Sequence, residues 1–93
     1  MAQLKRERLE VIYDILKIIK ENNNSIKPTP LLRFSNLSFK SYKEYHAELI
    51  DKKFIKEIED KKGKKIITLT DKGFDYLNQY NIIKNFIKDF DLD

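Results

Sequence analysis

The sequence predicts a mostly α-helical fold with one small β-hairpin, in the order α-α-α-β-β-α. Three observations lead to this prediction. Apolar residues recur at helical spacing near both ends of the chain, a Pro-Thr-Pro segment is placed to open a short helix, and two β-prone runs flank the stretch D-K-K-G-K-K at residues 60–65. The chain has 93 residues, 41% of them hydrophobic, which suffices for one domain with a modest core.

The first predicted helix covers residues 4–22. Its apolar side chains recur at intervals of three and four residues, which is typical of one face of an amphipathic helix. The polar run at residues 22–25 is expected to end this helix in a loop. The residues expected on the apolar stripe are Leu9, Val11, Ile12, Ile15, Leu16 and Ile19.

Two further helices are predicted in the middle of the chain. The second covers about residues 30–35, with Thr29 as its N-cap and Pro30 at its first position, where the missing N–H costs nothing. The third begins at Ser38 and runs over about residues 38–53. Two helices joined by a turn of about three residues form the geometry of a helix-turn-helix. One face of the third helix carries Tyr42, Tyr45, Leu49 and, more loosely, His46.

A β-hairpin follows, with strands over residues 54–59 and 66–69 and a charged turn over residues 60–65. Gly63 can take the positive φ that such a turn requires. Because a two-stranded hairpin is not stable alone in water, it must pack on the helices. The predicted fold is therefore a winged helix-turn-helix, with residues 60–65 at the tip of the wing.

The last helix is expected to start after a Thr70 cap and to run from about residue 71 to about 90. Its beginning, with Phe74 and Leu77, should pack on the first helix. Its apolar residues beyond about residue 80 would extend past the body, and an exposed apolar stripe of this kind favours a homodimer. The residues of this seam are Tyr76, Tyr80, Ile83, Ile87 and Phe90, with Phe86 beside them.

The chain accordingly divides into a winged helix-turn-helix domain over residues 1–73 and a C-terminal dimerisation helix over residues 74–93, continuous with it. The net charge of +4 is unevenly distributed between these parts. Residues 1–72 hold 17 Lys/Arg and 11 Asp/Glu, a balance of +6, and residues 73–93 hold 2 Lys and 4 Asp, a balance of −2. A basic body indicates a polyanionic partner, with nucleic acid first and an anionic membrane surface second.

Several function classes are disfavoured. The sequence has no cysteine, which excludes disulfides and thiolate metal sites, and its single histidine, His46, is expected to have a structural role. No phosphate-loop, serine-hydrolase or zinc-protease motif occurs, so we expect neither catalysis nor a cofactor, and no small-molecule ligand is evident. No run approaches the ~18 apolar residues of a membrane span. The simplest expectation is a cytoplasmic, nucleoid-associated protein.

The candidate DNA contacts follow from the predicted fold. The N-terminal end of the second helix of a helix-turn-helix contacts base edges, and lysines on a wing can neutralise phosphates. Arginine on the preceding helix can hold a phosphate. The wing lysines could instead form only a solvated turn that blunts the edge of the hairpin. The candidate residues are Arg33, Lys40, Ser41, Lys43, Glu44, Lys61, Lys62, Lys64 and Lys65.

Four segments appear in the chain in a familiar order. They are R-L-E-V-I-Y-D-I-L-K-I-I (8–19), S-N-L-S-F (35–39), Y-x-x-E-L-I-D-K-K-F-I (45–55) and L-T-D-K-G (69–73). With them the chain resembles the archaeal winged helix-turn-helix DNA-binding domains typified by the ten-kilodalton Sulfolobus DNA-binding protein. The resemblance implies binding of double-stranded DNA through the third helix in the major groove. It also implies a homodimer in which the C-terminal helices form an antiparallel coiled coil.

The resemblance also places glycine where this chain has Lys53. A lysine held at positive φ costs ~1 kcal/mol, so a different turn is an open alternative there.

Two roles are compatible with DNA binding: a transcriptional regulator at a preferred site, or a chromatin-like protein that coats DNA. The alternatives are a winged-helix protein–protein interaction module without direct DNA binding, and an RNA-binding winged helix. The interaction module would be favoured if the lysines of the wing and of the third helix were paired with neighbouring glutamates. Those glutamates are Glu44, Glu48, Glu57 and Glu59.

Overall fold

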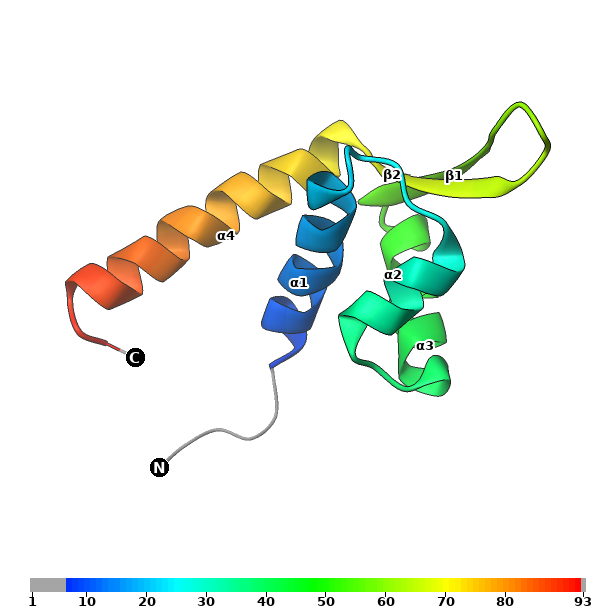
Figure 1. The fold of residues 1–93 in the computed structure, drawn as a ribbon. Coiled ribbons are helices and arrows are strands. Elements are labelled where there is room, and N and C mark those ends of the chain that lie inside the picture. Colours follow the sequence, from blue (N-terminus) through cyan, green and yellow to red (C-terminus); the bar gives the residue numbers. More distant parts are fainter. Residues whose placement is uncertain (1–6, 93) are drawn as a thin grey trace.

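A computed structural model of the chain describes residues 7–92, and the described elements follow the predicted order. Helices α1 to α3 form the body, the hairpin projects from one side of it, and α4 projects from the other (Figure 1). Residues 4–6 of the predicted first helix lie outside the described residues. The elements are α1 (Arg8–Glu21), α2 (Pro28–Ser35), α3 (Phe39–Asp51), β1 (Ile55–Glu59), β2 (Lys65–Leu69) and α4 (Asp71–Asp89).

Among the described residues, helix α1 supplies more of the core than any other element, with six of its fourteen residues, as its apolar stripe predicts. It packs against α2, α4 and β2, and Ile15, Leu16 and Ile19 are almost completely buried. The prediction for Leu9 was wrong, because this side chain lies in the first turn of α1 and is 56% exposed. The other elements contribute Leu31, Leu49, Ile67 and Leu77 to the same cluster.

The loop between α1 and α2 is more ordered than its polar sequence indicates. Asn23 and Asn24 both have positive φ, which asparagine tolerates better than most residues. The side-chain oxygen of Asn24 accepts a hydrogen bond from the Leu69 N–H at 2.6 Å. Ile26 then exchanges two backbone hydrogen bonds with Ile67, at 3.2 and 2.8 Å. The hairpin is thereby fixed to the helical body.

Helix α2 begins two residues earlier than predicted. Pro28, rather than Pro30, occupies the first helical position, and Lys27, rather than Thr29, precedes the helix in an extended conformation. Both observations have the same cause, since proline fixes the helical φ and disfavours a helical residue before it. Asn36, with φ near 60°, ends α2 as the sequence indicates. Ser38 caps α3 as predicted, because its hydroxyl accepts the N–H of Ser41 at 3.1 Å.

A left-handed turn joins α3 to β1. Lys53 has φ of 65°, its N–H donates to the Ile50 carbonyl, and the Phe54 N–H donates to the Leu49 carbonyl at 2.9 Å. This pattern is the Schellman motif that usually ends in glycine. The chain therefore keeps the turn that the resemblance implies and places a lysine in it.

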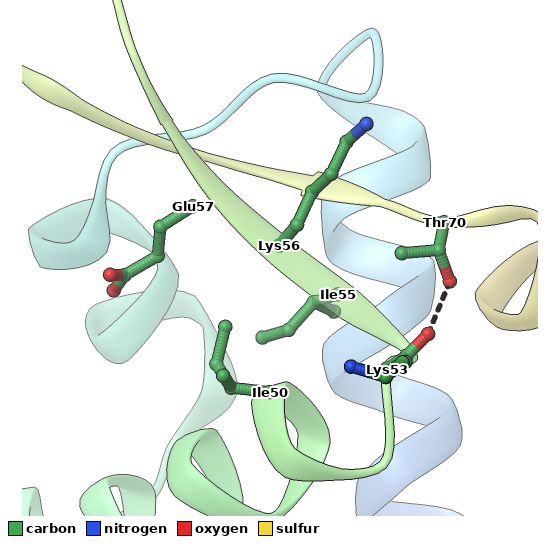
Figure 2. A pocket seen from close by; sticks show the side chains of 6 residues that line it. All are labelled: Ile50, Lys53, Ile55, Lys56, Glu57 and Thr70. Atoms are coloured by element: carbon green, nitrogen blue, oxygen red, sulfur yellow. Dashed lines mark hydrogen bonds between the residues drawn. The ribbon is translucent and has the colours of Figure 1, made fainter.

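The same turn also anchors the start of α4. The Thr70 hydroxyl donates to the Lys53 carbonyl at 2.5 Å (Figure 2) and accepts the Gly73 N–H at 3.2 Å, which confirms Thr70 as the cap. Gly73 lies so close to this turn that an added Cβ would stand 2.3 Å from the Phe54 carbonyl oxygen. The turn before β1 and the first turn of α4 thus form one joint.

The two halves of α4 have different surroundings. In the first half Leu77 is buried, and the Tyr76 hydroxyl donates to the Leu9 carbonyl at 2.7 Å. Tyr80 packs against Tyr13 with ring centroids 4.8 Å apart. Beyond residue 80, α4 extends away from the body (Figure 1). No helix within residues 7–92 is long and apolar enough to span a membrane.

Candidate nucleic-acid interface

Helix α3 and the hairpin lie on one side of α1, and the free end of α4 lies on the other (Figure 1). Tyr42 and Leu49 fix the orientation of α3, because both are buried in the core. The opposite side of the helix presents Lys40, Lys43 and Glu44 to solvent. The fold therefore exposes the polar side of the predicted recognition helix.

The predicted α3 residues do not all face the same way. Lys43 lines a shallow groove of about 420 Å³ between α3 and the hairpin, to which β2 contributes Lys65. Ser41 and Glu44 line a different hollow, on the side of α3 that faces α1. Arg8 of α1 forms an ion pair there with Glu48. The structure thus brings Lys43 near the hairpin and separates it from Ser41 and Glu44.

The wing tip is organised by Asp60. Its carboxylate oxygen accepts the backbone N–H groups of Lys62 at 2.8 Å and Lys64 at 2.9 Å. These hydrogen bonds, that of Lys64 first, hold the pKa of the Asp60 carboxyl below its usual range. Gly63 takes φ of 78°, as predicted for this turn. All four wing lysines (Lys61, Lys62, Lys64 and Lys65) are exposed.

Sequence reasoning noticed the lysines of the wing and missed the role of this aspartate. The signal was available, since Asp at the start of a tight turn commonly accepts hydrogen bonds from backbone N–H groups further along it. Asp60 thus fixes the shape of the lysine-rich tip through backbone N–H groups rather than through the lysine ammonium groups.

A side-chain relay links α3 to β1. The Tyr42 hydroxyl lies 3.1 Å from His46 Nδ1, and His46 Nε2 lies 2.9 Å from a Glu57 carboxylate oxygen. Burial, with the Glu57 charge as a second cause, raises the pKa of Tyr42 to about 12. The phenol therefore keeps its proton, and the His46 ring bridges the Tyr42 hydroxyl and the Glu57 carboxylate. Sequence reasoning expected a structural role for His46 and placed Tyr42 on the same face of the helix, but it did not find Glu57, because this partner lies on β1.

The ion pairs decide whether the lysine face is neutralised. The structure records pairs of Glu48 with Arg8 and Lys52, and of His46 with Glu57. Within residues 7–92 no ion pair involves Lys40, Lys43 or a wing lysine. The pairing that would favour a neutral protein-interaction surface is therefore not found in the described part of the chain.

Arg33 lies near the end of α2 with an exposed side chain. Its guanidinium carbon stands 5.3 Å from the ring centroid of its neighbour Phe34, a cation–π distance. The guanidinium is free to meet an anion from solvent, which is what a phosphate contact requires.

The predicted residues of the α4 seam fall into two groups. Tyr76 and Tyr80 are half-buried, and the half-buried Ile87 faces a hollow beside the start of α1. Ile83 and Phe90 are exposed, at 53% and 63%. The exposed apolar residues of this end are Ile82, Ile83, Phe86, Phe90 and Leu92. Ile82 was missed because the seam was traced at alternating intervals of three and four residues.

The remaining hollows lie beside β1 or between α1 and α4. One of about 470 Å³ lies beside β1, and Figure 2 shows the aliphatic side chains of Ile50 and Ile55 near the Lys53 turn. Within residues 7–92 no group of three His, Cys, Asp or Glu side chains is placed to hold a metal ion.

Comparison with known proteins identifies the fold family. The winged helix-turn-helix family matches residues 5–88. An uncharacterized protein of Methanocaldococcus jannaschii is 32% identical over 73 residues, which are 78% of this chain and 31% of that protein, so the chain spans about a third of that relative's length. The solved structure of F93 from STIV, described as a winged-helix DNA-binding protein, is similar with a TM-score of 0.70 and 26% identity over 90% of this chain and 94% of that one. These findings confirm the resemblance seen in the sequence: the chain belongs to the winged helix-turn-helix family.

Proposed function

We propose that this protein binds double-stranded DNA as a homodimer, with α3 in the major groove and the wing against the phosphate backbone. The observation that carries the proposal is the set of exposed lysines on α3 and the wing, which have no ion-pair partner within residues 7–92 and belong to two elements on the same side of α1 (Figure 1). The similarity to F93, described as a DNA-binding protein, supports the same assignment.

The electrostatics of the wing suit a phosphate backbone. Four exposed lysines repel one another in the free protein, and each phosphate that they neutralise releases condensed counterions from the DNA. The Asp60 carboxylate offsets one of these four charges, and its oxygen accepts backbone N–H groups within the turn. We therefore expect binding that weakens steeply as the salt concentration rises.

The remaining candidate residues have graded roles in this proposal. Lys40 and Lys43 are positioned to reach the major groove from the exposed face of α3, and Arg33 is positioned to hold a backbone phosphate from α2. Ser41 and Glu44 lie toward α1, so they would contact DNA only at the edge of the interface.

The outer half of α4 supplies the dimer contact in this proposal. Its exposed isoleucine and phenylalanine side chains have no cover in the monomer, and a two-fold axis would set the same stripe of a second chain against them. Residues 1–73 then act as the DNA-binding unit and residues 74–93 as the dimerisation helix. A dimer presents two α3 helices and two wings to one duplex.

The test is fluorescence anisotropy of a labelled random-sequence duplex titrated with the protein at three salt concentrations. We expect saturable binding whose affinity falls steeply with salt. A single-stranded RNA of the same length serves as the control, and it should bind more weakly. No binding to the duplex at low salt would contradict the proposal.

The same titration separates the two DNA-binding roles. A transcriptional regulator should have a preferred site that resists competition by unrelated DNA, above a weaker salt-dependent background. A DNA-coating protein should be displaced by any duplex in proportion to its length.

A further inference from the structure

The first residue of α3 carries an aromatic ring that the fold does not use. Phe39 is 63% exposed and is not among the side chains packed against the core. Within residues 7–92, the ring contact recorded for Phe39 is with the Lys43 ammonium, whose nitrogen stands 5.3 Å from the ring centroid. A single exposed ring is ordinary on a protein surface, so what singles out Phe39 is its place at the start of α3 beside a lysine.

The surroundings of Phe39 combine an apolar stripe with positive charge. Phe39, Lys43 and Ala47 follow one another at four-residue intervals, so they lie along one side of α3, and all three line the groove facing the hairpin. Lys65 lines the groove from β2. Glu57 also lines the groove and its carboxylate bonds to His46, so two lysines face one carboxylate there. A partner for this groove should therefore be an anion that also offers a small apolar group.

Duplex DNA offers that combination in its major groove. The phosphates supply the negative charge, and the 5-methyl group of thymine is the one apolar group that an unmodified base pair presents there. The N-terminal end of a recognition helix is the part that reaches base edges, and Phe39 occupies that end of α3.

We propose that Phe39 selects thymine by packing its ring against the thymine 5-methyl group. This inference rests on the proposed DNA binding and adds a base preference to it. Contact between the ring and the methyl group removes apolar surface of both from water. A base without the methyl group would leave the edge of the ring exposed to solvent. Lys43 holds a positive charge beside the contact, where it can meet a neighbouring phosphate or guanine.

The experiment removes the methyl group and leaves the rest of the DNA unchanged. A labelled duplex of alternating dA and dT is compared with the same duplex in which every dT is replaced by deoxyuridine. Burying one methyl group corresponds to about a fourfold change in affinity per contact. Wild-type protein should bind the dT duplex at least about fourfold more tightly than the deoxyuridine duplex.

The chain offers a matched control for the ring. Phe34 on α2 is also an exposed phenylalanine, at 51%, and has a cation 5.3 Å from its ring centroid, but it does not lie on α3. Phe39→Ala should reduce the preference for dT to about one, and Phe34→Ala should keep it. Both side chains are exposed, so circular dichroism should show that both variants keep the helical fold.

A second pair of duplexes tests whether the methyl group is recognised on any base or on thymine alone. A dG·dC duplex and its 5-methylcytosine form carry the same methyl in the same groove, so the methylated form should also bind more tightly if the methyl alone is recognised. Equal binding of dT and deoxyuridine duplexes by the wild type, or an unchanged preference in Phe39→Ala, would overturn this inference alone. Failure to bind any duplex would overturn the proposed function and this inference with it.

Discussion

The wing and the outer half of α4 both project from the helical body, on opposite sides of it, and their surfaces have opposite chemistry (Figure 1). The wing tip exposes four lysines around one glycine. The outer half of α4 exposes isoleucine and phenylalanine side chains, with the rings of Phe86 and Phe90 4.8 Å apart. One projection suits a charged partner and the other suits an apolar one.

The two projections are also held by different forces. The wing takes its shape from hydrogen bonds within its own turn, above all those to Asp60, so it is defined without any partner. The outer half of α4 is held by its helical backbone bonds and by a few contacts with α1, among them the Tyr13 hydroxyl, which donates to Asn81 at 2.8 Å, and Lys84 Nζ, which stands 4.8 Å from the Tyr13 ring centroid. This difference means that the wing has a defined shape of its own, whereas the end of α4 leaves an apolar stripe exposed.

The largest expected effect comes from placing charges on the α4 stripe. Replacing Ile83 and Phe86 by aspartate should weaken dimer formation at least about 100-fold, because a dimer would have to bury both carboxylates. Sedimentation equilibrium measures the change. Asn85→Asp adds the same charge to an exposed polar position of the same helix, and it should leave the dimer intact. A double variant that remains a dimer would place the interface elsewhere.

The next effect concerns the wing. Replacing all four wing lysines by alanine should lower DNA affinity at least tenfold and should reduce the slope of log affinity against log salt by up to about 3.6 for each bound monomer. Replacing Lys17 and Lys20, which lie on the side of α1 near α4, is the matched control and should change the slope little. An unchanged slope in the wing variant would remove the wing from the interface.

A smaller effect is expected at the joint between the two projections. Gly73→Ala should destabilise the protein by about 1–3 kcal/mol, because the new Cβ would stand 2.3 Å from the Phe54 carbonyl oxygen. Urea denaturation measures the loss. Asn78→Ala, at an exposed position of the same helix, should cause no such loss. A Gly73→Ala protein of unchanged stability would mean that the joint can open without cost.

The sequence predicts most of this fold, because its local signals agree with one another. Apolar spacing, the Ser38 and Thr70 caps and the glycine in the charged turn each mark an element that the structure contains. The wrong predictions lie where two sequence signals compete, or where the burial of a side chain depends on how the helices pack. Pro28 and Pro30 compete for the start of α2, and Leu9 has the right spacing but lies at the exposed end of α1.

The candidate interface is harder to predict from sequence than the fold. Charge and order in the chain identify the wing and α3, but they do not reveal which side of α3 each residue faces. Ser41 and Glu44 turn toward α1, and the partner of His46 is a glutamate eleven residues away on β1. Such pairings depend on how α3 crosses the hairpin, which no spacing along the chain specifies.

Two neighbouring lysines at the same joint should respond to glycine in opposite directions. Lys53 has φ of 65°, so Lys53→Gly should stabilise the protein by up to about 1 kcal/mol by relieving the left-handed strain. Lys52 has φ of −85°, so Lys52→Gly should destabilise it by about 0.5–1 kcal/mol through the added freedom of the unfolded chain. Both variants lose one lysine charge, and Lys52→Gly also removes the ion pair with Glu48, which adds to its loss of stability in urea denaturation. Changes of the same sign in the free energy of unfolding would contradict the claim that Lys53 is strained in this turn.

The smallest and most local effect is the titration of Asp60. Its pKa is lowered in the folded protein by hydrogen bonds from the Lys64 and Lys62 N–H groups, so its contribution to wing order is complete above the pKa of an unfolded aspartate. That contribution is lost as the pH falls through the lower folded pKa, because a protonated carboxyl is a weaker acceptor. The amide NMR signals of Lys62 and Lys64 should therefore shift with a midpoint below the usual range for aspartate, and Asp60→Asn should abolish the titration. The amide signals of residues 82–86 in α4 report whether this transition stays within the wing, and they should not follow the same midpoint. A midpoint in the ordinary range would mean that the Asp60 carboxylate does not hold the shape of the wing. The contrast between a wing ordered by its own hydrogen bonds and an α4 end with exposed apolar side chains would then lose its physical basis.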